Sequence, residues 1–471
     1  MVFPIAGGNE SKVYEVSNSL RFNDDDSPEL TFTPSSAGTQ TKFTISLWFK
    51  LGNITSTRRV LFGAGDDYLR IADDDNIQWH VTDNGGTARS FYAPAKIRDP
   101  SAWYHVVALW DTTQGTDTNR MRLWTNGVEQ TANSFTRPSQ NATSETLNSA
   151  AEHKLGGELN PANDYHFDGY ISEFYFIDGY AYDYQDFGEF NDNGVWIPKN
   201  FTGSYGSNGI RLQFKQTGTS ANSSGIGADT SGNDNHFAVT NLAATDITED
   251  TCTNNFATLN SIDHRVEDAT LSEGNCKFVG SNGNDGGSTS TIGVTSGKWY
   301  AEFKFLNDHK SRVGIIDQTG HDTNGNNVND GVHYDFTGGY IYATLNGTGN
   351  DTGNNSTSGG YDVTDGSTND ILGVALDADN EKVLFTLNGT TLGQEGDGFT
   401  NLQRTGTGET YFFHVRDGSG SGDDEPQIEC NFGNAPFSIS SGNNDGKYGN
   451  FEYAPPSGFY ALCTKRLAEF G

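Results

Sequence analysis

The stretch WYHVVALWD at residues 103–111 decides the fold of this chain, and a second run, RMRLWTNGVEQ at residues 120–130, follows it after a polar turn. The first run is rich in β-branched and aromatic residues and is too short for an ordinary helix, so it predicts a strand. The second run alternates polar and apolar residues and contains Asn126-Gly127, a strong hairpin signal. Together they predict three consecutive antiparallel strands.

Apolar side chains occupy both faces of the strand at residues 103–111. A strand tolerates this pattern when one face meets a second sheet and the other is covered by a ligand, a loop or a neighbour. We therefore expect this strand to lie centrally in a β-sandwich.

The composition indicates an all-β chain with more than one domain. Its 471 residues exceed the roughly 250 to 300 residues at which single cores stop growing. Gly is abundant at 58, Met occurs twice, and no long stretch has a period near 3.6, which favours many short strands joined by turns. With 30 Phe, 20 Tyr and 7 Trp, the core is expected to be largely aromatic.

The net charge argues against two classes of partner. Lys and Arg number 29 against 61 Asp and Glu, which gives −32. Such a surface repels nucleic acid phosphates and anionic lipids, so we expect neither nucleic acid binding nor membrane insertion. Carboxylate-rich loops can hold hard cations, so Ca²⁺ is the one cofactor considered. The acidity is equally explained by a solvated surface in a saline habitat.

The cysteines stand alone in the sequence, at Cys252, Cys276, Cys430 and Cys463. No close pair has metal-ligand spacing, so a zinc site is not expected, and the sequence cannot pair them as disulfides. The N-terminus lacks the basic and apolar regions of a secretory signal peptide. We therefore expect cytoplasmic synthesis without Sec export, and reduced thiols.

Residues 1–17 form a short segment with little to bury. Val2, Phe3, Pro4 and Ile5 make an apolar cluster ahead of flexible glycines. This composition is typical of a peptide that orders when it docks on a larger assembly, and equally of a disordered terminus.

A first sandwich is predicted for residues 18–200. The run FTISLWFK at residues 43–50 alternates, so it predicts a strand with Phe43, Ile45, Leu47 and Phe49 on one face. Further strands are expected at residues 59–62, 68–71, 77–81 and 167–179.

Five segments in this region occur in the order typical of one lectin group: residues 43–50, 103–110, 122–127, 155–157 and 167–176. They resemble the laminin-G/pentraxin group of concanavalin A-like lectin domains. The resemblance implies a jelly-roll sandwich that binds glycans or protein surfaces.

Some members of that superfamily are glucanases, which need two carboxylates about 5 to 9 Å apart. The best strand offers Asp168, Glu173 and Asp178. Their odd spacing predicts that successive members lie on opposite faces, about 17 Å apart along an extended strand. No nucleophile elbow, phosphate loop or His-Glu-x-x-His motif occurs. The sequence therefore predicts no catalytic residues.

Residues 201–264 are predicted to be a junction, because residues 217–227 are rich in Gly, Ser and Asn. The turn at residues 228–236 contains Asp229 and Asn233, whose side-chain oxygens could bind Ca²⁺. Asx-turn chemistry explains the same residues equally well.

A second sandwich is predicted for residues 265–463, followed by a C-terminal tail at residues 464–471. Its segments at residues 297–305, 370–377, 382–389 and 428–437 are similar to the SPRY domain. That resemblance implies another two-sheet sandwich, which binds partners through variable loops and is not a catalyst.

One loop of this second region resembles a Ca²⁺ loop at residues 322–331. Asp322, Asn324 and Asn326 place oxygen donors at the first, third and fifth positions. Asn327 stands at the position of the tight-turn Gly, and His333 replaces the bidentate Glu. A solvent-exposed loop without metal is the alternative reading.

Six short segments add a further resemblance: residues 18–22, 33–38, 98–105, 178–179, 194–199 and 455–462. With the tandem sandwiches they resemble virion structural proteins of marine tailed bacteriophages, over nearly the whole chain. The resemblance implies a location in the virion and contacts with other virion proteins.

Three functions follow from that resemblance. The first is a non-catalytic tail fibre or other appendage that binds a host-surface glycan or protein through sandwich loops. The second is a capsid-decorating protein that binds no receptor, and the third is an appendage glycanase. An appendage of this kind is expected to be a homo-oligomer, although no coiled-coil heptads support one here.

Overall fold

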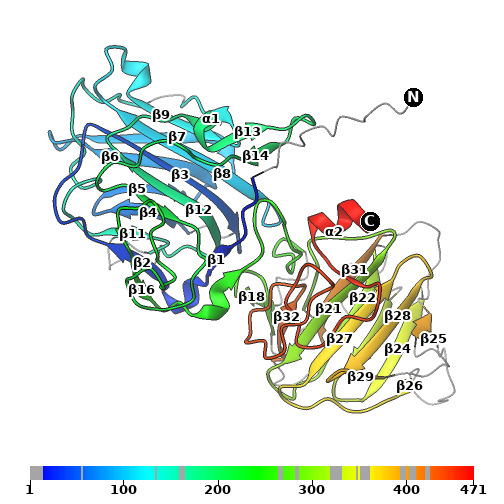
Figure 1. Ribbon diagram of the computed structural model, residues 1–471. Coiled ribbons are helices and arrows are strands. Elements are labelled where there is room, and N and C mark those ends of the chain that lie inside the picture. The colour runs from blue at the N-terminus through cyan, green and yellow to red at the C-terminus, as the bar shows by residue number, and fades with distance from the viewer. Residues whose placement is uncertain are drawn as a thin grey trace, which may run out of the picture.

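The chain folds into two β-sandwiches that lie side by side, the first blue to green and the second green to red in Figure 1. The computed structural model describes residues 14–54, 57–132, 135–157, 159, 165–263, 269–281, 286–318, 331–345, 348–350, 361–392, 399–401, 410–418 and 425–471.

The first sandwich consists of two antiparallel sheets whose inner faces share one core. One sheet runs in the order β10 (Val128–Glu129), β9 (Met121–Thr125), β8 (Trp103–Asp111), β3 (Lys42–Leu51), β12 (Gly169–Asp178), β1 (Ser19–Phe22) and β17 (Ile247–Thr248), with β15 (Ile210–Leu212) also paired to β12. The other runs in the order β16 (Ala238–Thr240), β2 (Glu29–Phe32), β11 (His153–Leu155), β4 (Arg59–Ala64), β5 (Asp67–Ile71), β6 (Asn76–Thr82) and β7 (Ala88–Lys96). Short 3₁₀ helices occur at η1 (Asp24–Asp26), η2 (Asp117–Asn119) and η3 (Ala244–Asp246).

The prediction for β8, β9 and β10 is confirmed, because the three strands pair consecutively and antiparallel. Alternate residues of β8, such as Val106 and Trp110, are buried in the main core. Val107 and Leu109 face the other way and pack in a second apolar cluster. Both faces of β8 are therefore covered, as its apolar pattern requires.

The cover over the outer face of β8 comes from residues 182–205. This segment contains α1 (Tyr184–Phe187) and a separate two-stranded hairpin, β13 (Gly188–Phe190) with β14 (Trp196–Pro198). Phe187 and Phe201 stack with ring centroids 4.9 Å apart and pack against Val107 and Leu109. The helix and the hairpin therefore lie on the outside of the sandwich, near β8 and β9 in Figure 1.

A β-bulge interrupts β12 between Ser172 and Tyr175, and Glu173 adopts a left-handed φ of +46°. The extra residue shifts the alternation by one. Phe174 therefore enters the same core as Ile171. The alternation predicted across Asp168, Glu173 and Asp178 assumed a strand of uniform period, and the bulge breaks that period at Glu173.

Residues 201–264 contribute β15, β16 and β17 to the sheets of the first sandwich. Ile226 and Phe237 are buried in its core. Burial of these side chains outweighs the local Gly, Ser and Asn composition, which by itself suggests flexibility. The first sandwich therefore extends to Thr248, beyond the boundary at residue 200 that the sequence suggests.

The second sandwich also has two sheets around one core. One runs in the order β18 (Ala269–Ser272), β19 (Lys277–Gly280), β32 (Gln427–Asn431), β21 (Lys298–Phe305), β27 (Ile371–Asp377), β28 (Lys382–Leu387) and β29 (Thr390–Thr391), with β30 (Phe399–Asn401) paired to β28 and β33 (Tyr460–Ala461) paired to β21. The other runs in the order β20 (Gly287–Thr289), β31 (Tyr411–Asp417), β22 (Ser311–Asp317), β23 (Gly331–Asp335), β24 (Tyr340–Leu345) and β25 (Thr348–Asn350), with β26 (Tyr361–Asp362) paired to β24. The tail predicted at residues 464–471 contains the helix α2 (Thr464–Phe470).

Direct contacts join the two sandwiches. The Tyr170 hydroxyl of β12 donates to the backbone oxygen of Gly274, at 2.8 Å. The Asn275 side chain donates to the backbone oxygen of Gly52, also at 2.8 Å. Both bonds are buried, so the sandwiches meet through a packed interface rather than through a linker alone.

All four cysteines are free thiols, and Cys276, Cys430 and Cys463 are buried. Burial raises the pKa of each of these thiols, which disfavours the reactive thiolate. Among the described residues, none of the helices combines the length and apolar character that crossing a membrane requires.

Candidate functional site

The outward face of β5, β6 and β7 carries a row of planar and polar side chains. In β5, Leu69 and Ile71 enter the core, so Tyr68 and Arg70 point outward. The register pairs Tyr68 with His80, Arg70 with Gln78, and Gln78 with Tyr92. We name these five residues, Tyr68, Arg70, Gln78, His80 and Tyr92, the outer-face platform.

The ring of Tyr68 contacts two other groups of the platform. It stacks on the His80 ring with centroids 4.7 Å apart and planes at 12°. The Arg70 guanidinium lies over the same ring, 4.0 Å from its centroid. Stacking and cation–π attraction therefore fix these three planar groups in one arrangement.

Gln78 links the rest of the platform. Arg70 Nε donates to Gln78 Oε1 at 2.8 Å, and Gln78 Nε2 donates to the Tyr92 hydroxyl at 2.7 Å. Because the Tyr92 oxygen accepts here, its own proton is available for a ligand. Gln78 is buried, whereas Tyr92 is 46% exposed. The platform therefore has a rigid floor and an accessible aromatic ring.

The protonation states of the platform suit hydrogen bonding to neutral groups. Burial lowers the pKa of His80, an effect that Asp67 partly opposes, so the imidazole is mainly neutral at pH 7. Burial also raises the pKa of Tyr68, so its hydroxyl keeps its proton. His80 Nδ1 lies 2.6 Å from the Ser90 hydroxyl oxygen, which fixes the ring orientation.

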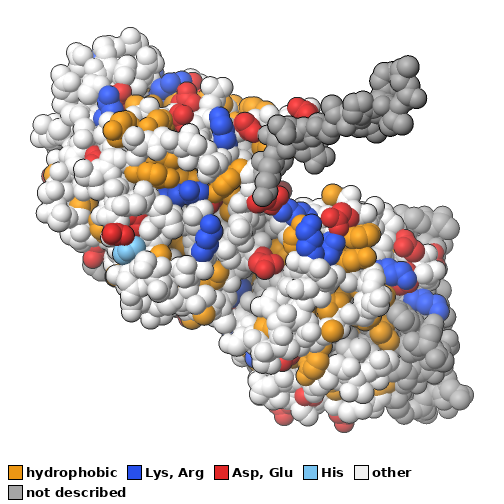
Figure 2. All heavy atoms as spheres, in the orientation of Figure 1, with side chains coloured by type: hydrophobic (Ala, Val, Ile, Leu, Met, Phe, Trp, Pro, Cys, Tyr) orange, Lys and Arg blue, Asp and Glu red, His pale blue; other side chains and the backbone are white. Residues whose placement is uncertain are grey.

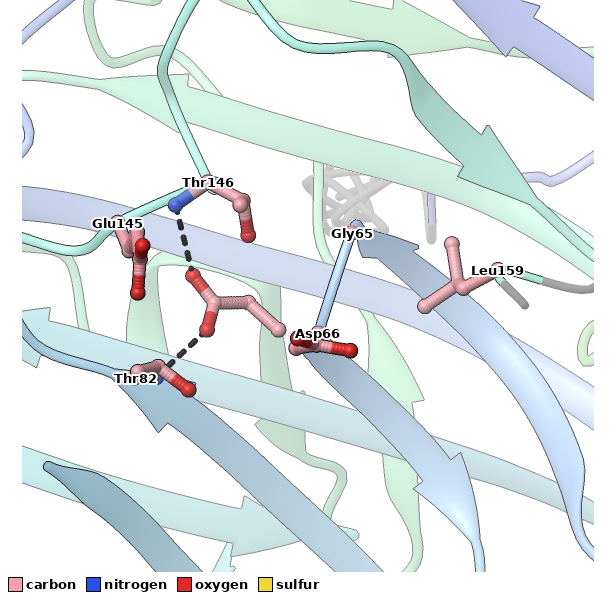
Figure 3. A pocket seen from close by; sticks show the side chains of 7 residues that line it. Gly65, Asp66, Thr82, Glu145, Thr146 and Leu159 are labelled. Atoms are coloured by element: carbon pink, nitrogen blue, oxygen red, sulfur yellow. Dashed lines mark hydrogen bonds between the residues drawn. The ribbon is translucent and has the colours of Figure 1, made fainter. Parts of the chain in front are cut away.

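A pocket of about 250 Å³ opens at the end of this platform, beside the β4–β5 turn. Asp66, Glu145, Thr82, Thr146 and Leu159 line it, and Figure 3 shows how these side chains are arranged. Asp66 and Glu145 are exposed. We name this cavity the loop pocket.

Asp67 builds the loop pocket and is not itself available to a ligand. Its carboxylate accepts from the backbone N–H groups of Thr82 at 2.5 Å and Thr146 at 3.1 Å, the dashed lines in Figure 3. It also accepts from the Ser144 hydroxyl at 2.9 Å and the Leu147 N–H at 3.2 Å. These bonds tie the loop at residues 144–147 to β6 and hold the pocket open.

The loop pocket adjoins the platform along two strands, because Asp66 precedes β5 by one residue and Thr82 follows His80 of β6 by two. Carboxylates accept charge-assisted hydrogen bonds from hydroxyl groups, and Tyr92 offers a donor and an apolar ring face. This arrangement suits a ligand with many hydroxyl groups and apolar C–H faces.

The structure places Asp229 and Asn233 in a tight turn stabilised from within. Asp229 accepts from the backbone N–H of Arg211 at 2.9 Å and of Asn235 at 3.0 Å, and from the Ser231 hydroxyl at 2.8 Å. Asn233 Nδ2 donates to two backbone carbonyls, at 2.7 and 2.9 Å. Both carboxylate oxygens of Asp229 are thus engaged by protein donors, which is Asx-turn chemistry.

Replacing Asp229 with alanine is therefore expected to lower the free energy of unfolding by about 2 kcal/mol, because several partly buried donors lose their acceptor. Urea denaturation measures this loss. The control is Asp234→Asn in the same turn, since Asp234 is exposed and Asn tolerates its φ of +58°. If EDTA lowered the melting temperature of the wild-type protein as much as the Asp229 substitution does, Asp229 would be a metal ligand instead.

The other predicted site residues lie outside the described residues: Asp322, Asn324 and Asn326, and Val2, Phe3, Pro4 and Ile5. Within the described part of the chain, no three His, Cys, Asp or Glu side chains lie close enough together to hold a metal ion.

The three carboxylates predicted on β12 serve separate networks. Asp168 accepts from the Asn53 N–H at 2.8 Å, and burial raises its pKa to about 7. Glu173 accepts from the Tyr14 hydroxyl at 2.8 Å. Asp178 accepts from donors in three other segments. Each carboxylate holds segments of the fold together, and these bonds provide no acid–nucleophile pair.

Sequence reasoning places β5 and β6 correctly but misses the platform. The alternation of Tyr68 with Leu69, and of Gln78 with Trp79, was a usable signal, because it puts polar and aromatic side chains on the solvent face. Their alignment across three strands depends on register, which the sequence does not reveal.

Residues 24–181 match a family model described as the Concanavalin A-like lectin/glucanases superfamily (Laminin_G_3). No curated protein matches the chain. Among solved structures, the SPRY domain of human HERC1 is 19% identical, with 35% of this chain and 94% of that chain covered and a TM-score of 0.27.

Further matches are a native heptameric SAP-like pentraxin from Limulus polyphemus and a candidate carbohydrate-binding protein from Bacteroides ovatus. The pentraxin is 14% identical, with 35% of this chain and 78% of that chain covered and a TM-score of 0.27. The Bacteroides protein is 14% identical, with 48% and 58% covered and a TM-score of 0.34. The chain is thus an all-β protein with a region similar to concanavalin A-like lectins, as its sequence predicts.

Proposed function

We propose that this protein is a non-catalytic carbohydrate-binding protein. Its first sandwich binds an oligosaccharide across the outer-face platform, with one end of the ligand in the loop pocket. The similarity of residues 24–181 to concanavalin A-like lectins supports a binding role for this sandwich.

The observation that carries the proposal is the fixed arrangement of the platform. Arg70, Gln78 and Tyr92 are joined by hydrogen bonds whose directions leave the Tyr92 proton and ring available. A site whose groups are oriented before binding loses little conformational entropy when a ligand arrives. Asp66 and Glu145 add acceptors at the pocket end.

A glycan microarray probed with the purified protein tests the proposal, and we expect a defined subset of oligosaccharides to bind. Tyr92→Ala should weaken binding to those oligosaccharides about tenfold or more, because it removes both the ring contact and a hydrogen bond. The control is Tyr180→Ala, since Tyr180 is similarly exposed at 44% but precedes α1, away from the platform. Isothermal titration calorimetry measures both affinities.

Two results would overturn this function. The first is an array without bound glycans, and the second is an equal loss of affinity in the Tyr92 and Tyr180 variants. Release of reducing sugar from a bound glycan would show a glycanase instead.

Within this function, we propose a role on a virion, as an appendage that presents the sandwich to a host-surface glycan. The support is the resemblance of the tandem sandwiches and their flanking segments to bacteriophage structural proteins. Gold-labelled antibody against the protein should mark the tails of purified particles. Label confined to the capsid would favour a decorating protein, and unlabelled particles would exclude a virion role while leaving carbohydrate binding intact.

A further inference from the structure

A second pocket, of about 390 Å³, lies between α1 and the β13–β14 hairpin. These elements follow the region that matches the lectin family, which ends at residue 181. Three aromatic residues line the pocket together with three polar ones: Tyr184, Phe190 and Trp196, and Gln185, Glu189 and Lys199. We name it the hairpin pocket.

Trp196 is fixed at the hairpin pocket by a chain of two hydrogen bonds, of which the inner one is buried. Its Nε1 lies 3.1 Å from His105 Nδ1, and His105 Nε2 lies 2.9 Å from the Ser46 hydroxyl oxygen. An indole N–H can only donate, so His105 Nδ1 must accept and its Nε2 carries the proton. The neutral tautomer of His105 therefore sets the orientation of the Trp196 ring.

Two glycines let the Trp196 ring approach the backbone closely. A Cβ atom at Gly127 would lie 2.4 Å from the ring, and one at Gly188 would lie 2.3 Å from it. Both distances are too short for any side chain other than hydrogen. Gly127 also has a φ of +75°, which favours glycine. The ring is thus held rigidly before any ligand binds.

The other two rings complete an aromatic wall that is partly open to solvent. Phe190 packs edge-on against Trp196 with centroids 4.9 Å apart, and Tyr184 lies 5.5 Å from the same ring. Phe190 is nevertheless 52% exposed. Figure 2 shows hydrophobic side chains at the surface of this side of the first sandwich. An exposed aromatic beside a rigid pocket indicates a contact surface.

The polar rim is as important as the aromatic wall. Gln185 and Glu189 are exposed, and the Lys199 ammonium donates to the backbone oxygen of Gln185 at 3.1 Å. An amide, a carboxylate and an ammonium supply both donors and acceptors around the rings. The pocket therefore suits a ligand with an apolar face and a ring of hydrogen-bonding groups.

We propose that the hairpin pocket is a second carbohydrate site, which takes a single pyranose ring against Phe190 and Trp196. The C–H face of the sugar packs on the rings, and its hydroxyl groups bond to Gln185, Glu189 and Lys199. This site goes beyond the proposed function, because it is independent of the platform. The platform lies on one sheet and the hairpin covers the other, so the two sites face opposite directions and can bridge two glycans.

Fluorine NMR of protein labelled with 5-fluorotryptophan tests this site, with Trp196→Phe used to assign the Trp196 resonance. The probes are the methyl glycosides of glucose, mannose and galactose, together with N-acetylglucosamine and glucuronate, each at up to about 50 mM because single-sugar affinities are in the millimolar range. We expect the Trp196 resonance to shift in a saturable way with at least one probe.

Variants separate this site from its alternatives. Phe190→Ala should weaken the affinity for that probe at least about fivefold, since it removes an aromatic contact of about 1 kcal/mol. Val195→Ala, at a neighbouring side chain that is 55% exposed, and Tyr92→Ala on the platform should leave it unchanged. Circular dichroism checks that each variant is folded.

Three outcomes would overturn the proposal. They are a Trp196 resonance that no saccharide shifts, a shift that Tyr92→Ala abolishes, and a shift produced by a proline-containing peptide but by no saccharide. The last outcome would make the pocket a peptide-binding site. None of these outcomes would overturn binding at the platform, which the microarray and Tyr92→Ala test separately.

Discussion

Replacing Lys50 with methionine is expected to lower the free energy of unfolding by about 3 to 5 kcal/mol, because the substitution leaves a buried carboxylate without its counter-ion. The Lys50 side chain, on β3, is 1% exposed, and Asp250 is fully buried. Lys50 Nζ donates to Asp250 Oδ2 at 2.9 Å and to Asn255 Oδ1 at 2.8 Å. Urea denaturation at pH 7 measures the loss.

This ion pair lies where the chain passes from the first sandwich to the second. Asp250 also accepts from the Trp103 indole at 3.1 Å and from the Phe256 N–H at 3.2 Å. It therefore connects β8 and β3 to the segment that enters the second sandwich. Loss of Lys50 should loosen the contact between the sandwiches as well as lower stability.

A double substitution separates charge from packing. Combining Lys50→Met with Asp250→Asn removes both charges and keeps an acceptor for Trp103 and Phe256, so it should recover at least half of the lost stability. The control is Lys154→Met, because Lys154 pairs with Glu29 on a partly exposed surface, where an ion pair contributes about 0 to 1 kcal/mol. A Lys50→Met protein as stable as the Lys154 variant would contradict the prediction.

Acidification is expected to weaken the protein through His105. Burial lowers the pKa of His105 to about 3, whereas an unfolded imidazole titrates near 6.5. The folded state therefore binds its proton more weakly than the unfolded state. The stability that depends on neutral His105 is fully present above about pH 6.5 and is lost as the pH falls toward 3, by about 1.4 kcal/mol per pH unit.

Comparison with His105→Gln isolates this contribution, because glutamine can accept from Trp196 and donate to Ser46 without titrating. Burial also lowers the pKa values of His153 and His333. The wild-type protein and the His105→Gln variant both retain these two histidines, so their effects cancel when the two stability curves are subtracted. Urea denaturation between pH 4.5 and 8 should show the wild-type curve falling more steeply below about pH 6.5. Parallel curves would mean that His105 can bind a proton without disturbing the fold.

The same titration affects the hairpin pocket. A protonated His105 would direct an N–H at the N–H of Trp196, which removes the bond that orients the ring. Saccharide binding at the hairpin pocket should therefore weaken as the pH falls. Binding at Tyr92, on the opposite sheet, should not depend on the protonation of His105.

The strands of the first sandwich could largely be predicted from sequence, because alternation is a local property. Phe43, Ile45, Leu47 and Phe49 of β3 all enter the core that their period of two indicates. The apolar pattern on both faces of β8 likewise required a cover on each side. The all-β class therefore followed from side-chain order alone.

The sites could not be predicted, because they depend on contacts between distant segments. Register aligns Tyr68, His80 and Tyr92 across three strands, and a slip of one residue would have turned each to the other face. Local sequence likewise gave no sign of the bulge at Glu173.

Long-range packing also decided the surroundings of Trp196 and the junction. Trp196 meets Gly127 and His105 only because the hairpin folds back over β8. Burial of Phe237 places the predicted junction, residues 201–264, against the core of the first sandwich. The sequence by itself determined which stretches alternate and are apolar enough to form strands. The tertiary structure decided which strands become neighbours, because the free energy of strand pairing and burial depends on the whole chain and not on any one stretch.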